Sequence, residues 1–193
     1  MPKKRSKKIN PRRIPMPKSM IDREGILEEA TRDDMYHAWL LVFNALVEQG
    51  RAKPDEFPAL VDDVNRYQNG LSFRGDGKDS EIACAERIMG IPSPYANLSP
   101  DKIRSADELE RFKRKVFRLA THIALCVICL GFDSTGRFTE DDLRLIFYNA
   151  DLALAEIDNG CNSYDAIEDA LCGYGVRIER TDDDFLSVSV GSD

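Results

Sequence analysis

The chain has 193 residues, of which 42% are hydrophobic and 32% are charged, and its formal net charge is −7. This composition is typical of a globular protein with one core or two small ones. The longest uncharged apolar run, residues 123–132, is about half of the ~20 residues that a bilayer-spanning helix needs, so we predict no membrane span. Prolines interrupt the basic N-terminus, which argues against a secretory signal and predicts a cytoplasmic protein.

Residues 1–19 form a basic segment without an acidic side chain, and their prolines and lack of apolar periodicity predict a disordered arm. Residues 20–193 contain the other 19 basic residues and all 34 acidic ones, a net charge of −15. Such a body repels nucleic acid and attracts basic protein surfaces, and a lysine-lined concavity on it would contradict this division. The arm can displace counterions from a phosphate chain, so its cations are the candidate nucleic-acid-binding residues: Lys3, Lys4, Arg5, Lys7, Lys8, Arg12, Arg13 and Lys18.

Residues 20–95 are predicted to form a first helical hairpin unit. Apolar residues at three- and four-residue steps predict a helix over 21–50 that stops at Gly50. Pro54 followed by two acidic residues indicates a second helix start, and Asn69-Gly70 is its predicted end. A flexible loop and a short helix complete the unit, over 70–79 and 80–89.

Residues 96–193 are predicted to form a second hairpin unit. A long helix over 106–131 precedes a helix start at Thr139, where Asp142 completes a capping box. When the first hairpin is shifted along the sequence by a constant number of residues, Gly50-Arg51 aligns with Gly136-Arg137, and apolar positions of the two hairpins also align. Either an internal duplication or the common period of helical hairpins explains this alignment.

The C-terminal residues are predicted to form a short helix over 163–172 and a β-hairpin from residues 175–178 and 185–190. Two strands alone are marginally stable in water, so the hairpin must lie on the helices or pair with another chain, a second copy included. The predicted fold class is therefore mainly α, with two similar helical hairpins packed together and a small C-terminal β-hairpin.

Three side chains that can bind metals share one face of the long predicted helix: His122, Cys126 and Cys129. Their neighbours are core formers and no second cluster of ligands is evident, so we interpret them as buried core residues. We interpret His37 likewise, as a histidine at the core edge. The five cysteines have no framework spacing, which indicates reduced thiols. We predict neither a metal nor a cofactor.

Two short stretches resemble ion or phosphate loops, and both fail on their residues. Residues 132–143 place Arg137 where a calcium loop needs an oxygen ligand. Residues 75–80 lack the hydroxyl that follows the lysine of a phosphate-binding loop. Because the two histidines both lie in apolar helices, the chain offers little material for nucleophilic catalysis, and we predict that it is not an enzyme.

The chain contains a set of short motifs: Asn10-Pro11-Arg12-Arg13-Ile14-Pro15, Trp39, Pro54-Asp55-Glu56, Tyr67, Asn69-Gly70, Ser163-Tyr164 and Tyr174-Gly175-Val176. Together they resemble the motifs of small accessory proteins encoded by phages and integrated elements of Gram-positive gut bacteria. Members of this group open with a basic, proline-interrupted tail, continue with a helical hairpin and close with a Ser-aromatic helix followed by Tyr-Gly-Val. This chain is longer than those proteins and carries a second hairpin. The resemblance implies an accessory protein of a mobile element that acts inside a bacterium.

The charge division and the resemblance together predict a non-enzymatic protein that binds a host nucleic-acid-processing complex. The partner would be a host protein or ribonucleoprotein, with the arm on nucleic acid phosphate and no membrane involved. An inhibitor of a defence nuclease, of the anti-CRISPR or anti-restriction type, is the sharpest form of this hypothesis. The alternative is a DNA-associated regulator or replication accessory protein in which residues 163–172 read a groove, although Asp165, Glu168 and Asp169 would repel phosphate there.

Overall fold

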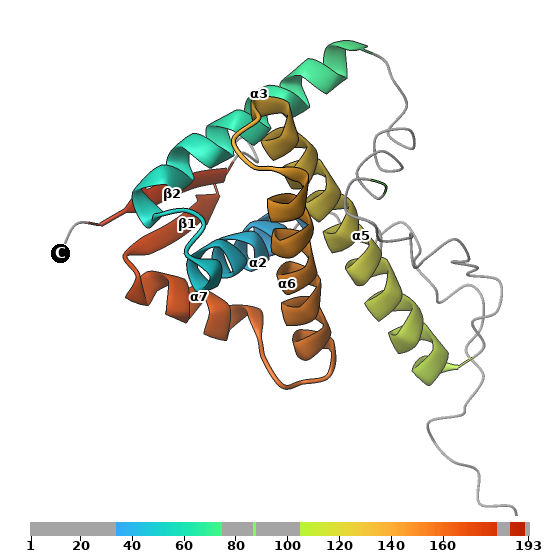
Figure 1. Ribbon diagram of the computed structural model, residues 1–193. Coiled ribbons are helices and arrows are strands. Elements are labelled where there is room, and N and C mark those ends of the chain that lie inside the picture. The colour runs from blue at the N-terminus through green and yellow to red at the C-terminus, as the bar shows by residue number, and fades with distance from the viewer. Residues whose placement is uncertain (1–33, 75–86, 88–104, 181–185, 192–193) are drawn as a thin grey trace, which may run out of the picture.

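The computed structural model describes residues 34–74, 87, 105–180 and 186–191. Within these ranges the chain is mainly α-helical and closes with a two-stranded antiparallel sheet, which confirms the predicted fold class (Figure 1). The elements are α2 (Asp34–Gln49), η3 (Pro54–Glu56), α3 (Phe57–Arg74), α5 (Ala106–Thr135), α6 (Glu140–Asp158), α7 (Tyr164–Gly173), β1 (Val176–Arg180) and β2 (Leu186–Val190).

Helix α2 is the central element of the fold. It is apolar on nearly every side, and a helix of that kind must be covered on most of its surface. It contacts α5, α6, α7 and β1. Trp39 and Phe43 of α2 are fully buried, and Phe43 stacks on Phe57 of α3 with ring centroids 4.1 Å apart. Trp39 meets Phe132 of α5 edge-on at 5.8 Å. Most buried apolar residues of the two predicted hairpin units therefore form one shared core, and Val116 and Ala120 of α5 belong to a separate small cluster.

The ends of several helices agree with their sequence signals. Gly50 and Gly136 both adopt left-handed backbone angles, with φ of 61° and 64°, at the C-termini of α2 and α5. Thr139 caps α6 together with Asp142, and the Ser163 hydroxyl accepts a hydrogen bond from the Ala166 N–H at the start of α7. These local signals fix the same turn after the first helix of each hairpin.

Two predicted helix ends are wrong. Helix α3 continues through Asn69-Gly70 to Arg74, and α5 continues past Gly131 to Thr135. A glycine inside a helix costs only about 1 kcal/mol relative to alanine, and packing between helices can offset that cost. Gly131 shows why a glycine is used here. A Cβ atom at this position would lie 2.7 Å from Val64 Cγ2 and 3.0 Å from Val64 Cα, so the missing side chain lets α5 approach the backbone of α3.

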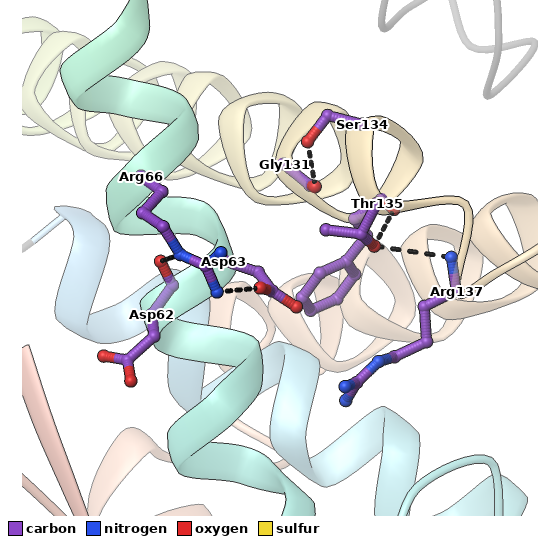
Figure 2. A network of polar contacts seen from close by, with 8 residues as sticks. Asp62, Asp63, Arg66, Gly131, Ser134, Thr135 and Arg137 are labelled. Atoms are coloured by element: carbon purple, nitrogen blue, oxygen red, sulfur yellow. Dashed lines mark hydrogen bonds and ion pairs between the residues drawn. The ribbon is translucent and has the colours of Figure 1, made fainter.

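Polar side chains near this crossing are hydrogen-bonded within their own helices (Figure 2). On α3, the Arg66 guanidinium donates to Asp63 Oδ1 at 2.6 Å and to the Asp62 carbonyl at 3.3 Å. On α5, the Ser134 hydroxyl donates to the Gly131 carbonyl at 2.7 Å. The crossing is therefore held by apolar packing and close backbone approach, and these polar groups do not bridge the two helices.

The C-terminal β-hairpin lies on the helices, as predicted. Ile178 pairs with Val188 in the antiparallel register, and β1 contacts α7 and α2 while β2 contacts α3. Gly175 begins the hairpin with φ of 76°, and a Cβ atom there would lie 2.8 Å from the Gly191 carbonyl oxygen. The Gly191 N–H donates to the Gly175 carbonyl at 2.9 Å. The glycine of the Tyr174-Gly175-Val176 motif therefore has a structural role.

Helix α5 has a window that is long and apolar enough to cross a membrane, but 67% of that window is buried inside the fold, as in a core helix. Several predicted features lie outside the described residues: the basic arm, the first part of the helix predicted over 21–50, the loop after Arg74, the prolines of the linker and the turn at 181–184. Of the short helix predicted over 80–89, Arg87 is described and is helical.

Candidate functional site

The residues that the sequence singles out do not form a reactive site in the described part of the chain. The eight cations of the arm lie outside it. His122, Cys126 and Cys129 all lie in the core, where the His122 ring meets Phe147 edge-on at 5.4 Å. Burial, and secondarily the nearby Cys126, raises the pKa of the Cys129 thiol well above its usual range. No group of three or more metal-ligating side chains comes together among the described residues.

The solvent-facing side of α6 carries an apolar stripe that the core does not use. Leu145, Tyr148 and Leu152 are 39%, 61% and 48% exposed. Their three- and four-residue spacing places them in one row along the helix. The opposite side of α6 packs into the core through Leu143, Ile146, Phe147 and other buried residues. Helix α6 is therefore apolar on two sides, and only one of them is covered.

Carboxylates flank both ends of this α6 stripe. Exposed Asp141 and Glu156 lie four residues before Leu145 and four residues after Leu152. Helix α6 itself carries six acidic side chains and one basic one, Arg144, which pairs with Glu140 and Asp141. An exposed apolar row with a charged rim is typical of a surface that binds protein.

A concavity of about 380 Å³ lies between α5, the end of α6 and the start of α7. Three basic side chains of α5 line it, Lys113, Arg114 and Arg118, together with two acidic ones, Glu110 and Asp158. Arg118 bridges two carboxylates of α6, at 3.0 Å to Asp158 and 3.4 Å to Asp151. The acidic body thus contains a concavity of mixed charge with a basic excess, which contradicts the predicted division of the chain into a basic arm and an acidic body.

Aromatic and apolar side chains form the rest of the wall of this α5–α7 concavity. The ring of His37 stacks on that of Tyr164 at 3.8 Å with an interplanar angle of 12°. Phe117, Leu154 and Ile157 also border the space. Burial raises the pKa of Tyr164 to about 12, although a hydrogen bond with the Thr121 hydroxyl acts in the opposite direction. Tyr164 is therefore a neutral phenol at physiological pH, and His37 lies at the core edge.

Neither the stripe nor the concavity was predicted from the sequence. The sequence does contain a pattern that indicates the stripe. Leu145, Tyr148 and Leu152 repeat at helical spacing, and they lie outside the face formed by Leu143, Ile146 and Phe147. No sequence pattern indicates the concavity, because it depends on how α5, α6 and α7 pack against one another. Comparison of the chain with protein-family models, curated proteins and solved structures found no match.

Proposed function

We propose that the protein is a non-enzymatic accessory protein that binds a host nucleic-acid-processing complex through the α6 stripe. The observation that carries this proposal is the exposed row of Leu145, Tyr148 and Leu152 within an acidic surface. Interfaces draw most of their energy from a few central apolar or aromatic side chains, and tyrosine is among the most common. The surrounding carboxylates select for a partner whose surface is basic.

The charge of this surface favours a protein partner over nucleic acid. Helix α6, which carries the stripe, has a net charge of −5, with six acidic side chains and one basic one. Phosphate chains are repelled by such a surface, whereas the nucleic-acid-binding channel of a host protein is complementary to it. On this account the body occupies or flanks that channel, and the eight cations of the arm contact bound RNA or DNA electrostatically.

The resemblance of several short motifs to those of phage and mobile-element proteins implies a biological setting for this interaction. An accessory protein of a mobile element that acts inside a bacterium meets host defence nucleases, whose channels are basic. The sharpest form of the proposal is therefore an inhibitor of a defence nuclease, of the anti-CRISPR or anti-restriction type. The acidic side chains of α7 disfavour the alternative in which this helix reads a DNA groove.

The test is an affinity pull-down from a bacterial lysate, carried out with and without nuclease treatment. The double variant Tyr148→Ala/Leu152→Ala removes the centre of the α6 stripe. Tyr174→Ala is the matched control, because Tyr174 is 60% exposed, as Tyr148 is at 61%, but lies after α7. We expect a nucleic-acid-processing protein to be retained after nuclease treatment, to be lost with the double variant and to be kept with the control. Capture that survives the double variant, or that depends wholly on nucleic acid, would contradict the proposal.

A further inference from the structure

We propose that the concavity between α5, α6 and α7 binds a nucleoside phosphate. None of its lining residues belongs to the α6 stripe, so this site is separate from the protein-binding surface proposed above. Its volume of about 380 Å³ lies within the range of about 300–1,000 Å³ that is usual for small-molecule sites. Three features of its wall define the ligand: basic groups without partners, an aromatic and apolar surface, and carboxylate acceptors.

The unpaired cations call for an anion. Arg118 is already held by Asp151 and Asp158. Lys113 is half-buried and Arg114 is exposed, and neither has a hydrogen bond or ion pair with another described residue. They lie one after the other on α5, and both line the space. Lysine and arginine are the usual ligands of phosphate, which can accept several hydrogen bonds at once.

The apolar part of the concavity wall is suited to a planar, weakly hydrated group of the ligand, next to its anionic group. The stacked pair of His37 and Tyr164 borders the space together with Phe117, and Leu154 and Ile157 add aliphatic surface. Side chains of these kinds accommodate nucleic acid bases by stacking and by apolar contact. A simple anion such as inorganic phosphate or sulfate would leave this surface in contact with water.

The carboxylates in the wall of the concavity narrow the chemical class of the ligand further. Glu110 and Asp158 line the same space, and an ionised carboxylate only accepts hydrogen bonds. A base offers amino and ring N–H donors to such groups. A phosphate, a planar ring and N–H donors within one small molecule are the combination found in a nucleoside phosphate.

The test measures binding of mononucleotides to the full-length protein by calorimetry and by ligand-observed NMR. A nucleoside without phosphate and inorganic phosphate alone are the two fragment probes. A short 5′-phosphorylated single strand distinguishes the terminal nucleotide of a nucleic acid from a free nucleotide as the source of the ligand. We expect at least one mononucleotide to bind more tightly than either fragment, because it fills both parts of the concavity.

The variant Lys113→Ala/Arg114→Ala should weaken nucleotide binding on the order of tenfold, the loss expected for removal of charge-assisted hydrogen bonds. Arg111→Ala/Lys115→Ala is the matched control, since it removes two exposed cations of the same helix that do not line the concavity. Both variants keep the arm, so nonspecific attraction by the arm affects them equally. Equal weakening in the two variants, phosphate binding as tight as nucleotide binding, or no nucleotide binding at millimolar concentration would each overturn the proposal.

These outcomes are independent of the protein-partner test. The α6 variant Tyr148→Ala/Leu152→Ala leaves the concavity intact and should bind nucleotide as the wild type does. Failure of the nucleotide site would therefore leave the proposed α6 interaction standing, and failure of the α6 interaction would leave the nucleotide site standing.

Discussion

At the scale of single residues, Gly131 sets the distance between α3 and α5. Its Cα hydrogens face Val64 so closely that a methyl group would meet both the side chain and the backbone of that residue. Backbone atoms cannot move aside as the tip of a flexible side chain can. The core around Trp39 and Phe132 therefore depends on Gly131, a residue that the sequence analysis interpreted as the end of a helix.

Gly131→Ala should destabilise the protein by about 1–3 kcal/mol, because overpacking forces the two helices apart. Gly70→Ala is the control, since Gly70 lies within α3 and nothing is within 4 Å of a Cβ atom there. That second change should raise the free energy of unfolding by up to about 1 kcal/mol, through helix propensity alone. Urea unfolding of both variants measures the difference. Equal and small effects at the two positions would show that the helices do not approach as described.

Tyr164 connects the nucleotide-binding proposal to a measurable titration. Burial of its ring raises the pKa of the hydroxyl to about 12 from the usual value of 10. The folded protein therefore holds this proton while the unfolded chain releases it, so stability from this residue is complete below pH 10 and is lost as the pH rises toward 12.

Ultraviolet titration of the wild type against Tyr164→Phe isolates the phenolate of this residue. The component missing from the variant should have a midpoint near pH 12 while circular dichroism still reports folded helix. A midpoint near pH 10 in folded protein would mean that the ring is open to water and that the wall of the concavity is not formed as described.

At the scale of the elements, the start of α6 is held by local contacts that also join the two hairpins. The Asp142 N–H donates to the Thr139 hydroxyl at 3.2 Å, and the Thr139 N–H donates to Asp142 Oδ2 at 3.1 Å. The Arg51 guanidinium, in the turn of the first hairpin, pairs with Asp142 Oδ1. The side-chain hydrogen bond from Thr139, its backbone hydrogen bond and Arg51 lower the pKa of Asp142.

Thr139→Ala should cost about 1 kcal/mol of stability, the usual effect of removing an N-cap hydroxyl. Thr139→Ser keeps the hydroxyl and should remain close to the wild type. Because the folded-state pKa of Asp142 is lowered, its contribution is present at neutral pH and is lost as the pH falls through that pKa. The difference between Thr139→Ala and the wild type should therefore shrink in acid, as thermal unfolding at a series of pH values would show. A difference that grows in acid would contradict this assignment.

Local signals explain which elements could be predicted from the sequence. The stop at Gly50, the cap at Thr139 and the alternation in the two strands depend on neighbouring residues, and the structure has all of them. The end at Gly131 was wrong because the close packing of α5 on α3 offsets the cost of a glycine inside a helix, whereas the exposed Gly70 has no packing contact that explains why α3 continues there. The α6 stripe was missed because an apolar period does not tell which face of a helix is covered. The concavity was missed because its wall comes from four separate helices.

At the scale of the whole molecule, charge is divided more finely than into a basic arm and an acidic body. The stretch from Arg111 to Arg118 in α5 carries five basic residues and no acidic one, whereas α6 and α7 together have a net charge of −8. The net charge of −15 for residues 20–193 conceals this difference. The concavity lies between the basic and acidic helices, and the α6 stripe lies within the acidic ones. The predicted division into a basic arm and an acidic body is therefore wrong for the body, which itself offers two distinct surfaces.

The central claim is that the α6 stripe contacts a host protein whose surface is basic. The most direct measurement is site-specific photo-crosslinking in bacterial cells, with a photoreactive amino acid in place of Tyr148 and, in a separate protein, in place of Tyr174. The account predicts that position 148 crosslinks to a nucleic-acid-binding protein and that position 174 does not. Crosslinks at position 148 to nucleic acid, or the same products at both positions, would contradict it.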